Sequence, residues 1–462
     1  MTIWTPTLDS GIAKYLALAN AIEVAIETGT LKPDEKLPPQ RRLADALKVT
    51  IGTVTRAYSE AERRDLVVAK VGSGTFVKAA NKTDSTAYTM AHSVPGKIDM
   101  RAAFAPQGPQ ARMLSTAMSL MATDQGLLQD LLCYAPELGH SKHRESFQRW
   151  LANEPVALDN CDFLITHGGQ HAISVLINML CREGDCILTE NMVFPGVLSA
   201  AQDRGVKVVP IEMDENGIIP ESVIIACQRH KPRAIYLTPN VQNPSGTQLS
   251  VERRKQLIDI CRQFGMKVIE DDVQFLAKED KPISMQQLAP DICFYLTSFS
   301  KRFGGAIRIG LLVAPEEFFN KTRLSLRASS WTNSPLLIHW LSLWIDNGEL
   351  ANLEIWLANE MRERHKIAKE HLSTWLKPTP NSSFNLWIQL PPGWLSHEFV
   401  SQAFEQGVLV RSADEYRVAY YMPAPAVRLC LSRPIDHEQL TEAVKVLRSI
   451  LEDGPLIKDA LI

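Results

Sequence analysis

The sequence has few cysteines, little net charge and no long apolar run. Its eight cysteines are scattered, and only Cys181 and Cys186 lie close together. No C-x-x-C pair or similar ligand spacing occurs, so we expect no metal site and favour reduced, buried thiols. The N-terminus lacks the basic start and apolar core of a signal peptide, and no run approaches the length of a membrane span. These absences predict a cytoplasmic protein that makes no membrane contact.

Length and charge indicate more than one part. A chain of 462 residues is too long for one ordinary core, so we expect two or three domains. The net charge of −3 says little about nucleic acid, but residues 36–78 carry nine Lys or Arg against four Asp or Glu. A basic N-terminal module on a mildly acidic body is typical of a DNA-binding head, although a solvated basic face has a similar composition.

The N-terminal residues predict a helix-turn-helix followed by a hairpin. Residues 14–31 form an amphipathic pattern with Gly29 as a stop. In KLPPQRRLADALKVTIGTVTRAYSEAERRDLV, a short helix and a longer one flank a tight connection at residues 48–50. VVAKVGSGTFV then alternates into two strands around a Gly-Ser-Gly turn, which is a β-wing. The alternative is a structural helical hairpin whose arginines are only solvated.

These same segments, "LPPQRRLADAL", "TIGTVTRAYSEAERRDLV" and "VGSGTFV", closely resemble the winged-helix domain of GntR-type regulators. One departure is Asp65, where the family usually has glycine. In a helix-turn-helix the start of the second helix enters the major groove of double-stranded DNA. The resemblance therefore makes the following residues the DNA-contact candidates: Arg41, Thr50, Thr53, Thr55, Arg56, Gly72, Ser73 and Gly74.

Three parts follow from this reading: a winged helix-turn-helix over residues 1–78, a linker over 79–97 and a body over 98–462. The linker is rich in Ser, Thr, Ala and Asn, and the alternative is a loop packed on the body. In the body, β-branched runs such as CDFLIT, DCILTE, RAIYLT and MKVIEDD alternate with helical stretches. That alternation predicts an α/β domain with a mostly parallel sheet, whose ligands bind at the C-terminal strand ends.

The segment SFSKRFGGAIRIG, residues 298–310, raises the central question of the body. Its lysine, Lys301, is either part of a solvated loop or a nucleophile whose partner is held by the neighbouring serines and an arginine. A lysine that forms a Schiff base needs a phosphate anchor, a ring-nitrogen partner and a hydroxyl partner. The chain offers each one after a predicted strand: Gly169 and Gln170 at a helix start, Asp271 at a strand end and Asn243 in a turn. Taken singly, Asp271 and Asn243 could equally serve turn structure.

Together these residues resemble a fold-type I, class I/II aminotransferase that binds pyridoxal 5'-phosphate. The resemblance implies a mostly parallel sheet with a smaller C-terminal α+β subdomain. It also implies that Lys301 forms the Schiff base and that Asp271 pairs with the ring nitrogen. Asn243 would bond the ring hydroxyl and Arg428 would grip a substrate carboxylate, unless Arg428 is a solvated arginine on an exposed strand. The remaining cofactor-binding candidates are Gly169, Gln170, Phe194, Ser298, Ser300 and Arg308.

The body departs from the aminotransferase pattern at a few positions. Val273 and Gln274 stand where a tyrosine usually follows the ring-nitrogen aspartate. Phe194 replaces the usual stacking tyrosine, and Ser382 and Ser383 replace a usual glycine pair. A lost phenol removes a hydrogen-bond donor to the cofactor. These changes are compatible with cofactor binding and leave turnover open.

A winged helix joined by a linker to an aminotransferase-like body is the arrangement of the MocR group of GntR regulators. The resemblance implies a pyridoxal phosphate-dependent transcription factor that senses an amine, an amino acid or the cofactor itself. It also implies a homodimer, and in the MocR group the head of one subunit is able to rest on the partner's body. The alternatives are a working aminotransferase with an appended DNA-binding head, and a cofactor-free scaffold.

Overall fold

The computed structural model describes residues 4–8, 13–27, 30–32, 35–64, 66–70, 74–77, 94–419 and 421–455. The chain divides into two compact units, Met1–Tyr88 and Thr89–Ile462. Most of the predicted linker, residues 79–97, lies outside the described residues, so its ends stay predictions. Each unit is described by itself below.

The N-terminal unit is a small three-helix core with a two-stranded hairpin. Its elements are α1 (Lys14–Glu27), α2 (Gln40–Leu47), α3 (Ile51–Arg63), β1 (Val67–Lys70) and β2 (Gly74–Val77). Leu18, Ile22, Leu43 and Val54 are buried in one cluster, because the apolar positions of all three helices face inward. The strands pair antiparallel from Val67↔Val77 to Lys70↔Gly74. The helix-turn-helix and its wing are therefore present, as the sequence predicted.

The C-terminal unit contains a seven-stranded sheet in the order β4-β12-β11-β10-β9-β5-β6. Its strands are β4 (Cys161–Thr166), β5 (Cys186–Glu190), β6 (Lys207–Ile211), β9 (Ala234–Leu237), β10 (Lys267–Asp271), β11 (Cys293–Ser298) and β12 (Gly310–Pro315). Only β12 runs antiparallel to its neighbours β11 and β4. The sheet is mostly parallel, as predicted, and β12 is a strand that the sequence did not predict.

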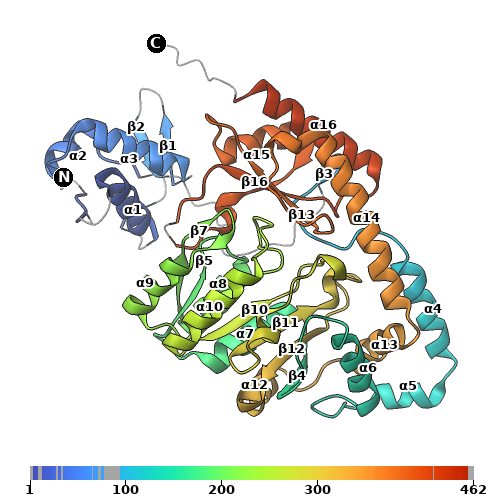
Figure 1. Cartoon of the computed structure of the whole chain (residues 1–462). Coiled ribbons are helices and arrows are strands. Elements are labelled where there is room, and N and C mark those ends of the chain that lie inside the picture. Colours follow the sequence, from blue (N-terminus) through green and yellow to red (C-terminus); the bar gives the residue numbers. More distant parts are fainter. Residues whose placement is uncertain are drawn as a thin grey trace. The chain divides into compact units, whose positions relative to one another are not determined.

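Helices cover both faces of this sheet, as expected for parallel strands that are apolar on both sides (Figure 1). One face carries α7 (Gly169–Leu180), α8 (Pro195–Arg204) and α12 (Glu316–Ser329). The other carries α9 (Pro220–His230), α10 (Val251–Phe264), α11 (Met285–Leu288), α4 (Gln110–Ala122), α6 (Ser141–Leu151) and α13 (Pro335–Asp346). The short α5 (Gln125–Leu131) follows α4.

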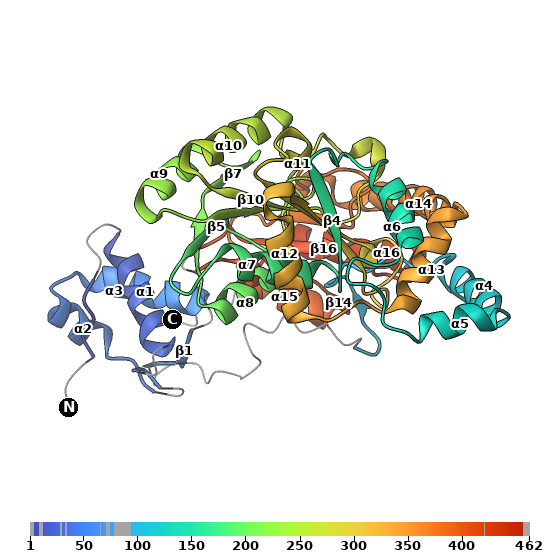
Figure 2. The same cartoon turned by 90° about the horizontal axis from the view of Figure 1, so that it is seen from below.

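A smaller α+β subdomain follows, as predicted. Its sheet has the order β13-β16-β15, from β13 (Asn385–Gln389), β15 (Arg411–Ser412) and β16 (Ala426–Cys430). The long helix α14 (Glu349–Leu372) leads into it, and α15 (Ser396–Glu405) and α16 (His437–Asp453) pack on it. β3 (Ile98–Asp99) pairs with β14 (Val408–Leu409), so the start of this unit joins its C-terminal part. β14 itself lies beside α15 (Figure 2). A separate hairpin joins β7 (Met213–Asp214) to β8 (Gly217–Ile218).

The cysteines and the helices test two expectations from composition. All eight cysteines are unpaired and six are buried, but Cys133 is exposed and Cys161 is half-buried. The expectation of buried thiols is therefore wrong at Cys133, which follows the short helix α5, and only partly met at Cys161, the first residue of β4. Among the described residues, no helix is long and apolar enough to cross a membrane. In the same part of the chain, no group of three or more His, Cys, Asp or Glu side chains could hold a metal ion.

Candidate functional site

The C-terminal ends of the central strands bring the predicted body residues together. Asp271 is the last residue of β10, Ser298 is the last residue of β11, and Gly169 opens α7 three residues after β4 ends. Asn243 stands in the turn that follows β9. Parallel strands place their carboxyl ends at one edge of a sheet, which explains why sequence-distant side chains meet here.

The SFSKRFGGAIRIG segment forms a chain of hydroxyl and guanidinium contacts. Ser298 Oγ lies 3.2 Å from Ser300 Oγ, and Arg308 Nη1 donates to Ser300 Oγ at 3.2 Å. Arg308 Nη2 donates to the His167 carbonyl at 3.2 Å, next to Gly168. Gly168 has φ +84°, and a Cβ there would lie 3.0 Å from Arg308 Nη2. Glycine therefore keeps the helix start open beside this guanidinium.

Lys301 lies in the same segment, directly after the two serines. Its side chain is half-buried, and its Nζ donates to the Ala103 carbonyl at 2.5 Å. Burial, together with the charges of Arg428 and Arg308, lowers the pKa of Lys301 to about 8, and Cys430 and Asp271 oppose this shift. Near pH 8, a lysine with this pKa is neutral more often than an exposed lysine. The neutral amine is the form that attacks a carbonyl carbon.

Asp271 is fixed by two donors. Tyr236 donates its hydroxyl to Oδ2 at 2.5 Å, and the Val273 backbone N–H donates to Oδ1 at 2.9 Å. Burial raises the pKa of Asp271 to about 6, and the bond from Tyr236 opposes that rise. Glu190 is a second buried carboxyl close enough to interact with Asp271, and burial raises its pKa to about 7. The site thus holds two carboxyls whose charge is costly without a cation nearby.

Arg428 is buried, with 1% of its surface exposed. Its Nη1 donates to Asn243 Oδ1 at 2.8 Å and its Nη2 donates to the Arg101 carbonyl at 2.5 Å. Its guanidinium also lies 5.0 Å from the centre of the Tyr416 ring. The alternative of a solvated arginine on an exposed strand is therefore wrong, because β16 is covered on both faces. The predicted hydroxyl partner and the predicted carboxylate partner are direct neighbours.

The side chains of Gln170 and Phe194 both lie beside Gly196. Gln170 Nε2 donates to the Gly196 carbonyl at 2.9 Å. A Cβ at Gly196 would lie 1.9 Å from Gln170 Oε1 and 2.3 Å from the Phe194 ring. Phe194 precedes α8 and is half-buried. The aromatic ring and the amide that the sequence singled out are therefore packed against one another.

The departures from the aminotransferase pattern have local explanations. The Val273 side chain fills space beside Gly169, where a Cβ would lie 2.6 Å from Val273 Cγ2. Ser382 Oγ donates to Asp280 at 2.5 Å and accepts from the Ala277 N–H at 3.0 Å. Ser383 Oγ donates to the Asn385 carbonyl at 3.0 Å. The two serines are thus hydrogen-bonded parts of the turn before β13.

Sequence reasoning missed four residues of this site. Tyr236 holds Asp271, Glu190 faces it, Cys430 lies near Lys301, and the Arg101 carbonyl accepts from Arg428. Tyr236 sits inside the strand motif RAIYLT, where its apolar neighbours indicate burial and nothing indicates a polar partner. A buried tyrosine normally finds a hydrogen-bond acceptor, and this rule is the signal that could have identified it.

In the N-terminal unit, the predicted DNA-contact residues gather at the start of α3. Thr50 is the N-cap: its Oγ1 accepts from the Thr53 N–H at 3.2 Å and lies 2.9 Å from Thr53 Oγ1. Thr55 donates its hydroxyl to Gln40 Oε1 at 2.7 Å, which ties α3 to α2. Arg56 is exposed on the same helix.

Arg41 on α2 is also exposed, and Gly74 begins β2 with φ +111°. Gly72, Ser73 and Asp65 lie outside the described residues, so their predicted roles stay predictions. Lys48, with φ 52°, makes the tight connection between α2 and α3. The turn geometry and the exposed arginines match a helix-turn-helix that presents its second helix.

Comparison with known proteins explains both units. Residues 106–447 match the family described as aminotransferase class I and II. The chain belongs to this family. Residues 14–77 match the family described as bacterial regulatory proteins, gntR family. The GntR-type head and the aminotransferase-like body that the sequence predicted are therefore confirmed.

Similar proteins share this two-part arrangement. The uncharacterized HTH-type transcriptional regulator YdeF of Bacillus subtilis is 28% identical over 459 residues, which cover 97% of each chain. The probable rhizopine catabolism regulatory protein MocR of Rhizobium meliloti is 25% identical over 469 residues, covering 96% of this chain and 94% of MocR. The fold is similar to the crystal structure of Pyrococcus horikoshii kynurenine aminotransferase, with TM-score 0.70 and 20% identity over 78% of this chain and 92% of that one.

Proposed function

We propose that this protein is a transcriptional regulator that binds double-stranded DNA and uses pyridoxal 5'-phosphate to sense an amine or amino acid. One observation carries the proposal: Lys301, a lysine of lowered pKa, lies with Asp271 at the C-terminal ends of adjacent strands, in a chain that also has a GntR-type head. Similar proteins named as HTH-type regulators over nearly the whole chain support the regulatory part.

The residues present fit the cofactor. Pyridoxal phosphate supplies an aldehyde that amines attack and a ring that withdraws electrons. The Lys301 amine would bond that aldehyde, and the Asp271 carboxylate would pair with the ring nitrogen. Ser300 and Arg308, with the start of α7, provide hydroxyl, guanidinium and N–H donors suited to a phosphate. Gly168 keeps this donor set free of a Cβ.

A bound cofactor would also compensate the charge of the buried carboxyls. Asp271 and Glu190 are both buried, and burial raises the pKa of each. A protonated ring nitrogen beside Asp271 would compensate its charge, as an opposite charge does for any buried carboxylate. A ligand carboxylate that reaches Arg428 would replace the Arg101 carbonyl at Nη2, while Asn243 holds Nη1.

The head is proposed to bind DNA through the start of α3. Arg56 and Arg41 are exposed there, and the hydroxyls of Thr50 and Thr53 lie together at the helix start. Such groups meet phosphates and base edges in the major groove. The wing around Gly74 would lie against the neighbouring backbone.

We further propose a homodimer. Leu132 and Tyr134, just after α5, are 87% and 83% exposed, and Met118 and Leu120 on α4 are also exposed. A group of large apolar side chains that is this exposed marks a contact surface. The partner is a second copy of the chain, because a palindromic DNA site would require two copies. Light scattering of the purified protein and of a Leu132→Asp variant tests this: the variant should be monomeric.

A working aminotransferase remains the second candidate. The lowered pKa of Lys301 favours this function, because a lysine whose pKa is about 8 can accept and release a proton during turnover. Steady conversion of amino and keto acids by the purified protein would support this function. The absence of turnover, together with selective DNA binding, would support the regulator.

The test is fluorescence anisotropy on DNA from upstream of the gene and its neighbour, at fixed physiological salt, with and without pyridoxal phosphate. We expect selective binding over scrambled DNA, and an affinity that changes with the cofactor in the wild type and not in Lys301→Ala. Selective binding that ignores the cofactor would contradict the sensing role. Equal binding to scrambled DNA at several salts would contradict the regulator at this locus.

A further inference from the structure

A polar cavity of about 250 Å³ lies between the large sheet and the small sheet of the C-terminal unit. One wall comes from the loop between β5 and α8, from the β7 hairpin and from the turn that follows Asn243. The other comes from Lys377, from β13 and from residues 421–424. Sites between two such layers are frequent ligand sites, because a ligand there contacts both.

Asn191 lines this cavity and is itself 1% exposed. Both atoms of its side-chain amide are buried without a hydrogen bond of normal geometry. The Tyr421 hydroxyl reaches the Asn191 side chain, but one hydroxyl cannot serve both the donor and the acceptor of an amide. Buried amide atoms rarely stay unsatisfied, so this arrangement points to a polar group that belongs in the cavity.

The cavity also presents one charge of each sign. Glu215 and Lys377 line it, and neither forms an ion pair with any residue that the structure describes. The neighbouring Asp214 is already occupied, since it accepts from Arg253 Nη1 at 2.7 Å and from the Asn216 N–H at 2.8 Å. A free carboxylate and a free ammonium on one cavity suit a ligand that carries both charges.

We infer that this cavity binds a free amino acid with a polar side chain. Lys377 takes the ligand's carboxylate, Glu215 takes its ammonium group, and the Asn191 amide pairs with the polar end of its side chain. The polar lining and the buried amide of Asn191 disfavour an aliphatic side chain. This site is separate from Lys301 and needs neither the cofactor nor DNA.

The walls of the cavity continue into the candidate cofactor site. Ser245 lines the cavity two residues after Asn243, and Trp387 lines it from the β13 position that pairs with Arg428. A ligand held here would therefore stabilise the segments that carry Asn243 and Arg428. Binding at one site would then change affinity at the other, because both sites use these segments, and the change would be equal in both directions.

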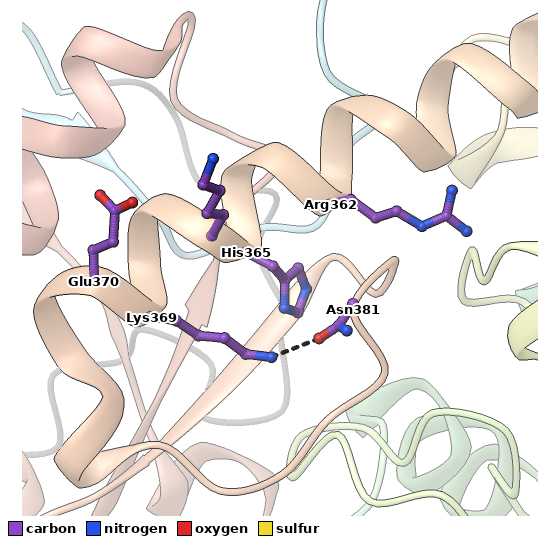
Figure 3. A pocket seen from close by; sticks show the side chains of 6 residues that line it. Arg362, His365, Lys369, Glu370 and Asn381 are labelled. Carbon is purple, nitrogen blue, oxygen red and sulfur yellow. Dashed lines mark hydrogen bonds between the residues drawn. The ribbon is translucent and has the colours of Figure 1, made fainter.

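A hollow on α14 offers a matched control surface. It is lined by cationic side chains, but they do not converge: Arg362 extends away from Glu370, and Lys369 is turned toward Asn381, to which it donates at 2.6 Å (Figure 3). Lys366 also lines this hollow and is exposed. A Lys366→Met variant removes one positive charge from the same unit without touching the cavity.

The experiment is calorimetric titration of the full-length Lys301→Ala protein with L-glutamine, whose side-chain amide complements Asn191. With neither protein carrying the cofactor, we expect L-glutamine to bind the wild type and Lys301→Ala with equal affinity. Asn191→Leu should weaken binding by about tenfold or more, as expected for a buried amide contact. Lys377→Met, at the accessible end, should weaken it by about fivefold, and Lys366→Met should leave it unchanged.

L-leucine should bind more weakly than L-glutamine. Far-ultraviolet circular dichroism and thermal unfolding establish that Asn191→Leu is folded, and Lys377→Met tests the site even if it is not. No heat from any common amino acid would overturn the inference. Binding unchanged in both Asn191→Leu and Lys377→Met would also overturn it, and binding lost only in Lys301→Ala would assign the ligand to the cofactor site.

Discussion

The Tyr236 hydroxyl donates to Asp271 Oδ2 at 2.5 Å, and both side chains are buried. The two residues stand on adjacent parallel strands, β9 and β10. The phenol therefore fixes the carboxylate that the cofactor ring is proposed to meet, in a chain that has Val273 and Gln274 where aminotransferases usually carry a tyrosine. A hydroxyl donor reaches the site from a different strand.

Tyr236→Phe removes this donor. The bond from Tyr236 opposes the effect of burial on Asp271, so we expect the pKa of Asp271 to rise above 6 in the variant. Cofactor affinity near neutral pH should fall by about tenfold, in line with the loss of one charge-assisted hydrogen bond. Visible absorbance during titration with pyridoxal phosphate measures this.

Tyr295→Phe is the control for that change. Tyr295 is equally buried, and its hydroxyl donates at 2.6 Å to Oδ2 of Asp272, the residue that follows Asp271. The Tyr295→Phe variant should lose about as much unfolding free energy as Tyr236→Phe and keep the wild-type affinity for the cofactor. Equal affinity in the two variants would show that Tyr236 does not act through Asp271.

Asp271→Asn should stabilise the cofactor-free protein at neutral pH. Burial raises the folded-state pKa of Asp271 to about 6, above its ordinary 3.8. A raised carboxyl pKa means that the folded state binds a proton more tightly than the unfolded state, so stability falls as pH rises from about 4 to about 6. The full effect, up to about 3 kcal/mol, is present above that window.

Denaturant unfolding of both proteins between pH 4 and pH 7 checks this. The two stability curves should diverge as pH rises and run parallel above pH 6 to 7. Asp271→Asn should also bind pyridoxal phosphate more weakly, because the amide cannot compensate a protonated ring nitrogen. Parallel curves across the whole range would mean that Asp271 titrates at its ordinary pKa.

Much of the fold could be predicted from short strands and their spacing, because each parallel strand is a continuous apolar run. CDFLIT matches β4 residue for residue. β12 was missed because GLLVAP follows directly on the lysine motif, and its antiparallel direction breaks the alternation of strand and helix. Its glycine is required, since a Cβ at Gly310 would lie 2.8 Å from Thr166 Oγ1 and from the Thr297 carbonyl.

The site was predictable where its residues sit in local motifs and unpredictable where contacts span the chain. Ser298, Ser300 and Arg308 are close in sequence, and their mutual contacts follow from that spacing. The bond between Arg428 and Asn243 joins residues 185 positions apart, and no local pattern encodes it.

Cofactor binding should depend on pH through Lys301. Burial lowers the pKa of Lys301 to about 8, so its neutral fraction rises as pH increases from 7 to 9. We expect the observed rate of pyridoxal phosphate binding to rise about tenfold per pH unit below pH 8 and to level off above it. Stopped-flow absorbance measures the rate. A free lysine at its ordinary pKa would give a rate that still climbs at pH 10, and that result would contradict the lowered value.

Arg56→Ala should weaken operator binding, and the way it does so shows whether Arg56 contacts a base edge or a phosphate. Arg56 is exposed on α3, near the helix start that Thr50 caps. If it reads a base edge, selective binding should fall by about 1–3 kcal/mol while binding to scrambled DNA barely changes. If it contacts a phosphate, both affinities should fall together and the salt dependence should become less steep.

Anisotropy titrations at several salt concentrations distinguish the two outcomes. Arg229→Ala is the matched control, because Arg229 is an exposed arginine on α9 of the C-terminal unit. It should leave both affinities unchanged. Unchanged binding in Arg56→Ala would remove α3 from the proposed DNA interface, since the residue lies on its exposed face and an alanine preserves the helix.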